Sequence, residues 1–165
     1  MANKQSFTPE EWTKILESTM LTGMAVSAAE PSGLWGALKE AFARSSALAA
    51  AKMDAGSSEL IKAVIADFET SEGRTAIQEA IRKRMTGAKP ADAVQRSLTN
   101  LREVSAILDA KAPGDAASFK GWLRNISQKV AEASAEGGFL GIGGVQVSDA
   151  EKATLADIAK ALGTA

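Results

Sequence analysis

The sequence predicts an all-α protein, a single compact bundle of about seven helices. Apolar residues recur at spacings of three and four along most of the chain, which is the pattern of amphipathic helices. No segment shows sustained alternation of apolar and polar residues between hairpin turns, as a sheet would require. Apart from residues 136–147, the breaks between periodic segments are short, as is usual between the helices of a bundle.

Length and charge narrow the class of protein further. The 165 residues suffice for one domain with its own core, which we place at 8–165 behind a flexible N-terminus, 1–7. A net charge of −1 argues against a nucleic-acid partner. No apolar run approaches the ~18 residues of a membrane span. The first residues lack the apolar core of a signal peptide, so we expect a cytoplasmic protein.

The first four helices are predicted from caps and apolar stripes. The first begins at Thr8, with Glu11 closing a capping box, and ends before Pro31. The second begins near Ser32 and ends at 54–56. The third is capped by Ser57 or Ser58 and breaks at 70–73, and the fourth stops at Gly87. Their main apolar positions are Trp12, Ile15, Leu16, Met20, Met24, Leu34, Trp35, Leu38, Phe42, Leu48, Leu60, Ile61, Val64, Ile65, Phe68, Ile77, Ile81 and Met85.

Three further helices follow. The fifth opens at Pro90, with Asn100 and Arg102 predicted to face outward. Asp115 is predicted to cap the sixth, and a second capping box at 148–151 starts the last, which ends at Gly163. We expect the three tryptophans to lie in the core. The core positions of these helices are Val94, Leu98, Leu101, Ile107, Leu108, Phe119, Trp122, Leu123, Ile126, Val130, Leu155, Ile158, Ala159 and Leu162.

Missing residue types restrict the chemistry. The chain has no His, no Cys and no Tyr. A disulfide, a Cys/His zinc site and an imidazole base are therefore excluded. We predict that the protein is not an enzyme and needs no cofactor.

The segment 136–147 differs from the rest because it places five glycines around Phe139, Leu140 and Ile142. It matches neither of the common glycine-rich phosphate motifs. These apolar residues either anchor the loop on the core or form an exposed tip for a protein partner or a second copy of the chain. We expect Phe139 and at least one neighbour to be buried, because ordering each residue costs about 1–2 kcal/mol of backbone entropy.

Four carboxylates, Glu30, Glu136, Asp149 and Glu151, could gather at one end of the bundle. Oxygen ligands of this kind suit Ca²⁺ or Mg²⁺. Helix capping already accounts for Asp149 and Glu151, so capping is the favoured interpretation and a cation site is the alternative. The charged groups 82–84 and Asp67, Glu69 and Glu72 are predicted to be solvated helix faces.

The ends of the first and sixth helices are similar, each an apolar stripe closing in Ala-Glu before a break and a leucine. Two interpretations stay open, a chance agreement between amphipathic helices and a weak internal duplication. The matching positions are Leu16, Met20, Met24, Ala29, Glu30 and Leu34 against Trp122, Ile126, Val130, Ala135, Glu136 and Leu140.

The C-terminal fifth resembles the TerB-like proteins, small bacterial all-α proteins linked to tellurite resistance and stress. The resemblance is carried by 130–137, 147–151, Leu155, Ile158–Ala159 and Leu162–Gly163. Glu151 matches the family Glu, whereas Glu136 replaces its usual Asp and the connection is longer. The resemblance implies a non-enzymatic interaction or metal-associated stress module. The alternative is a protein that binds a small apolar ligand, with 136–147 as its lid.

Overall fold

The computed structural model describes residues 2–29, 50–51, 57–135 and 147–165. This part of the chain is all-α, as predicted, and contains no strand. It holds six α-helices and one short 3₁₀ helix. Their bounds are η1 (Lys4–Ser6), α1 (Pro9–Ala29), α3 (Glu59–Glu69), α4 (Ser71–Met85), α5 (Pro90–Lys111), α6 (Pro113–Ala135) and α7 (Asp149–Ala161). Of the helix predicted over 32–54, residues 50–51 are described, and they are helical.

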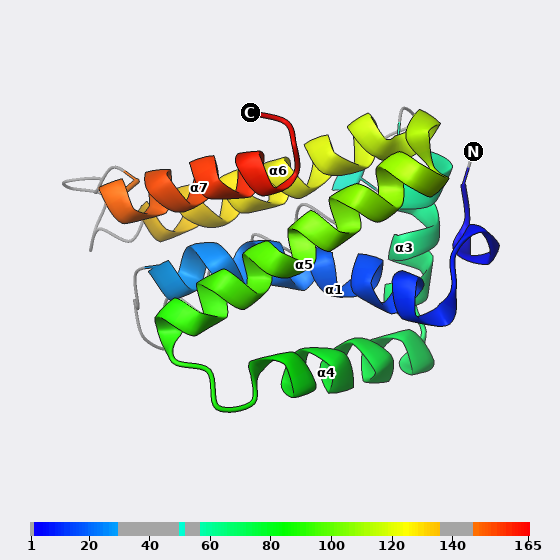
Figure 1. The fold of residues 1–165 in the computed structure, drawn as a ribbon, viewed down its shortest axis with the longest axis horizontal. Coiled ribbons are helices and arrows are strands. Elements are labelled where there is room, and N and C mark those ends of the chain that lie inside the picture. Colours follow the sequence, from blue (N-terminus) through cyan, green and yellow to red (C-terminus); the bar gives the residue numbers. More distant parts are fainter. Residues whose placement is uncertain (1, 30–49, 52–56, 136–146) are drawn as a thin grey trace.

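Helix α1 lies at the centre and contacts each of the other five described α-helices (Figure 1). Helices α6 and α7 lie on one side of it, α4 lies on the other, and α5 crosses it. The sequence explains this position, because residues 18–29 contain no charged side chain. A helix without a charged face can be surrounded by others.

The buried part of α1 also holds hydroxyl groups, and each of these finds a partner within the helix. Ser18 donates to the carbonyl of Ile15 at 2.7 Å, and Thr22 donates to that of Ser18 at 2.6 Å. Both side chains are fully buried. Since buried polar groups are costly only when unpaired, these residues can line the centre of the bundle.

The core joins apolar residues from all six described α-helices. Trp12 and Trp122 belong to it, as predicted, while Trp35 lies outside the described residues. The largest fully buried side chains are Phe119, Ile15, Leu16, Leu21, Leu60, Leu98, Leu101, Leu108, Leu123, Ile126, Ile158 and Leu162. None of the described helices combines the length and the apolar character that a membrane crossing would need.

Several predicted helix ends are confirmed. The Thr8 hydroxyl accepts the Glu11 amide at 3.2 Å, and the Glu11 carboxylate accepts the Thr8 amide at 2.7 Å. Ser58 caps α3, and Gly163 follows α7 with a φ of 67°. At the tight corner between α3 and α4, a side chain at Gly73 would place its Cβ 2.1 Å from the carbonyl oxygen of Asp67.

The prediction that Asp115 caps the sixth helix is wrong. Helix α6 begins at Pro113, so Asp115 lies inside its first turn. Its buried carboxylate accepts the backbone N–H of Ala2 at 2.7 Å instead. The partner lies 113 residues earlier, near the N-terminus, which a local pattern could not reveal.

Residues 2–7 cross the ends of three helices. Beyond the Ala2 contact with α6, Lys4 Nζ lies 3.0 Å from Asp67 on α3, and the rings of Phe7 and Trp12 are 5.9 Å apart. Residues 2–7 therefore contact α6, α3 and α1. The flexibility expected for residues 1–7 stays a prediction.

Candidate functional site

Most of the residues predicted to form a site lie outside the described part of the chain. This holds for two of the proposed cation ligands, Glu30 and Glu136, and for the loop residues Phe139, Leu140 and Ile142. The predictions made for them, including burial of Phe139, stay predictions.

The other two proposed cation ligands, Asp149 and Glu151, act at the start of α7. Glu151 is buried, and its carboxylate accepts the Ser148 amide at 2.9 Å, while Ser148 Oγ accepts the Glu151 amide at 3.2 Å. Asp149 is exposed and lies 3.6 Å from Lys152 Nζ. This confirms the predicted capping box. Among the described residues, no three acidic side chains are arranged to hold a metal ion.

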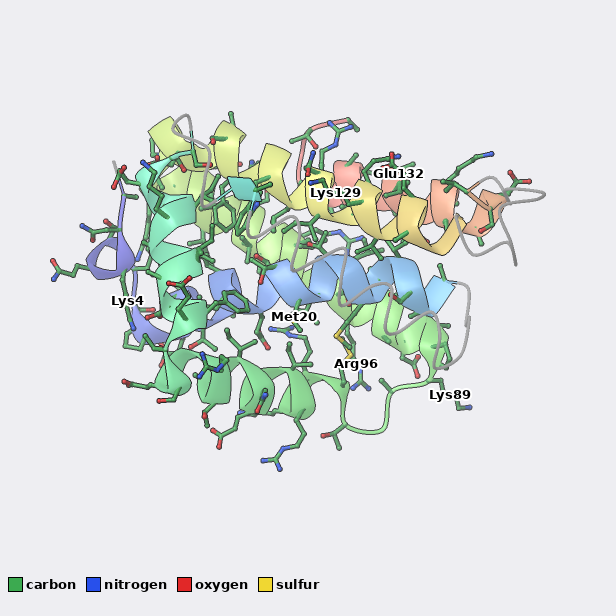
Figure 2. All side chains as sticks on the ribbon, turned by 180° about the vertical axis from the view of Figure 1, so that it is seen from behind. Lys4, Met20, Lys89, Arg96, Lys129 and Glu132 are labelled. Atoms are coloured by element: carbon green, nitrogen blue, oxygen red, sulfur yellow. The ribbon has the colours of Figure 1, made fainter. Side chains whose placement is uncertain are left out.

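The structure instead places a groove between α1 and α4. Its volume is about 540 Å³ and its walls are mainly apolar. Small-molecule sites typically have such volumes and walls, with a few polar groups that fix the ligand. In Figure 2, the labelled side chains of Met20 on α1 and Arg96 on α5 lie toward α4. The groove is lined by Pro9, Glu10, Thr13, Lys14, Glu17, Ala80, Lys83 and Arg84.

The base of the groove is a buried ion pair. Glu17 on α1 is only 2% exposed. Arg84 on α4 donates through Nε to its Oε1 at 3.3 Å and through Nη2 to its Oε2 at 2.8 Å. Two parallel bonds of this kind hold a guanidinium group in a fixed plane. Glu17 therefore positions Arg84 within the groove.

Asn100 on α5 completes this pair, and the prediction that it faces outward is wrong. Its side chain is fully buried, and Nδ2 donates to Glu17 Oε2 and to the carbonyl of Lys14, both at 3.3 Å. Ser97 lies one turn earlier and is buried as well. Helix α5 meets α1 at this point, so a polar side chain is needed beside the Glu17 charge.

Two further predictions of solvated charges need correction. Arg82 and Lys83 are exposed, as expected, but Arg84 is directed into the bundle by the 100° turn between successive helical residues. Asp67 accepts the indole N–H of Trp12 at 2.6 Å, besides its ion pair with Lys4. Arg84 and Asp67 each bind a side chain of α1, namely Glu17 and Trp12. The charge pattern alone did not indicate these contacts.

The end of α4 beside the groove is held by Arg96 of α5. Its Nη1 donates to the carbonyl of Arg84 at 2.7 Å and to that of Thr86 at 2.9 Å. A cationic side chain at a helix C-terminus satisfies carbonyl groups that lack helical partners. This contact fixes the segment that carries Lys83 and Arg84.

The rim of the groove carries both paired and unpaired charges. Lys14 Nζ lies 3.1 Å from Glu103 on α5, which balances its charge. Glu10 and Lys83 are exposed, and neither forms an ion pair with another described residue. Within the part of the chain that the structure describes, the lining therefore carries one acidic and one basic side chain whose charge has no partner.

Comparisons of the chain with protein-family models, with curated proteins and with solved structures found no match. Function is therefore inferred from the geometry of the site. The sequence signal that could have indicated this site is Glu17 itself, because it lies directly after the buried positions Ile15 and Leu16 and before an uncharged stretch. A charge at such a place needs a buried partner.

Proposed function

We propose that this protein is a non-enzymatic binding protein that holds a small ligand in the groove between α1 and α4. The observation that supports this most is a mainly apolar groove of about 540 Å³ with a fixed ion pair at its base. Pockets that bind small molecules combine these features. The proposal keeps the ligand-binding class predicted as the alternative but moves the site away from 136–147.

Binding is favoured over catalysis because the buried carboxylate of Glu17 is already paired with other side chains. Glu17 is the most buried acidic group on the lining, and it already accepts bonds from Arg84 and Asn100. A general base needs an oxygen that is available to the substrate. In this arrangement Glu17 holds Arg84 and Asn100, and ligand contact is left to the other residues of the lining.

The wider context is proposed from the sequence resemblance. A TerB-like stress role in the bacterial cytoplasm, and contact with a protein partner or a second copy, are compatible with a ligand-binding bundle. The seventh helix, over 32–54, is proposed from its periodic apolar residues, and the internal duplication is proposed from the similar ends of the first and sixth helices. None of these proposals is needed for the groove to bind a ligand.

The groove can be tested by filling it. We expect Ala80→Trp to place an indole between α1 and α4, because Ala80 lines the groove and is half-buried. Ala117→Trp on α6 is the matched control, since Ala117 is exposed and does not line the groove. The probe is 8-anilinonaphthalene-1-sulfonate, followed by fluorescence titration and by amide shifts in NMR spectra.

The expected result is that the probe shifts amides along 9–17 and 80–84 and that Ala80→Trp weakens its binding at least tenfold, while Ala117→Trp does not. Circular dichroism should show both variants folded. Equal binding to both variants, with shifts elsewhere, would exclude the groove as the binding site.

A further inference from the structure

The structure also indicates which chemical class the groove would bind, an inference that rests on the proposed function. We infer that the ligand is a small amphiphilic anion. Its charged head would lie at Lys83 and Arg84, and its apolar body would lie along Pro9, Thr13 and Ala80. Three features of the described residues support this assignment.

The first feature is the free edge of the Arg84 guanidinium group. Nε and Nη2 of Arg84 donate to the Glu17 carboxylate, whereas Nη1 of Arg84 has no hydrogen-bond partner among the described residues. The side chain keeps 20% of its surface exposed. Because arginine carries five donors in a rigid plane, pairing on one side leaves donors directed elsewhere. These donors suit a carboxylate, sulfonate or phosphate head.

The second feature is the distribution of charge along the groove. Glu17 is compensated by Arg84 and Lys14 by Glu103, which leaves Lys83 and Glu10. Lys83 adjoins Arg84, whereas Glu10 precedes Glu17 by seven helical residues, or about 10 Å along the axis. An anion is attracted to the Lys83 end and repelled from the Glu10 end. This asymmetry sets one orientation for the ligand.

The third feature is the apolar surface of the groove. Its lining includes Pro9, Thr13, Lys14 and Ala80, residue types that carry a ring, methyl groups or an aliphatic stem. Long charged side chains often cover apolar surface with such stems. An inorganic anion would leave this surface without contacts, so a head attached to an apolar body fits the groove better.

The test compares two probes that share one aromatic skeleton. The anionic probe is 8-anilinonaphthalene-1-sulfonate, and its neutral counterpart is N-phenyl-1-naphthylamine. From the strength of charge-assisted hydrogen bonds, we expect the anion to bind about tenfold more tightly. Added salt should weaken binding of the anion and leave the neutral probe unaffected.

Substitutions locate the head. Lys83→Met should weaken anion binding by roughly three- to tenfold without changing the affinity for the neutral probe. Arg82→Met removes the same charge from the neighbouring exposed residue, which does not line the groove, and should change neither affinity. These substitutions leave the Glu17–Arg84 pair intact, so folding is preserved.

The outcomes separate the two proposals. Suppose that both probes bind equally well, that Lys83→Met has no effect and that Ala80→Trp blocks both. The groove then binds ligands without a preference for anions, and this inference is wrong. If Ala80→Trp blocks neither probe, the proposed function itself fails.

Discussion

At the scale of single residues, the pairing of Glu17 with Arg84 matters most. Removing a carboxylate from water is costly, and only close partners offset that cost. Arg84 and Asn100 supply such partners from two different helices. The pair thereby ties α4 and α5 to the central helix while it orients the guanidinium group in the groove.

Removing one member of this pair should destabilise the fold. Arg84→Met leaves Glu17 buried with only Asn100, and loss of one partner from a buried pair costs roughly 3–5 kcal/mol. We expect the low end, about 3 kcal/mol, because Arg84 is 20% exposed. Urea unfolding measures this change. The double variant Glu17→Met/Arg84→Met should recover most of the loss, since apolar residues of similar volume can replace a buried ion pair.

The control is Arg82→Met, which should change the free energy of unfolding by no more than roughly 0.5 kcal/mol. An Arg84→Met variant as stable as this control would show that Glu17 does not depend on its partner.

At the scale of elements, the start of α1 is joined to the end of α5. Glu11 closes the capping box with Thr8 and also accepts a 2.7 Å bond from Lys111 Nζ. The pKa of Glu11 is lowered below its ordinary value of 4.5. The largest cause is the hydrogen bond from Lys111, and the next is the hydrogen bond from the Thr8 amide. Both bonds favour the ionised carboxylate.

This lowered pKa predicts a pH-dependent contribution to stability. A group whose pKa is lower in the folded state stabilises the fold above its unfolded pKa, and this is lost as the pH falls through the folded pKa. The contribution should therefore be complete above about pH 4.5 and decline below it. Lys111→Met should flatten the decline in urea unfolding free energy between pH 5 and about pH 3. An unchanged slope would show that Lys111 does not influence Glu11.

The sequence predicted these elements well where the decisive contacts are local. Capping residues such as Thr8, Ser58 and Ser148 act within four residues, so their roles follow from spacing. The roles of Asn100 and Arg84 depend on which helix packs against theirs. Helical periodicity gives a face but not its neighbour. The position of Glu17 indicated that it needed a buried partner, but neither the identity of that partner nor the groove beside it could be predicted.

At the scale of the whole molecule, the helices differ in how firmly they are held. Helix α1 has contacts with all five other described α-helices and buries eleven of its residues. Helix α4 lies at the outside and buries only Gly73 and Ile77 among its 15 residues. Among the described residues, α4 is further attached to the bundle by partly buried side chains, by the Arg84 pair and by the Arg96 contacts. Of the two helices that form the groove, α4 is therefore the less firmly held.

This difference predicts the order in which the helices open. Local stability follows the number of buried contacts, so amides in the middle of α1 should exchange with solvent only when the whole protein unfolds. Amides of α4 should exchange through a smaller opening with a lower free energy and a weaker dependence on denaturant. Native-state hydrogen exchange at increasing urea concentrations measures both. If α4 exchanged with the same free energy and urea dependence as α1, the two would unfold as one unit. A ligand could then enter the groove only through its open side, because α4 would not move separately.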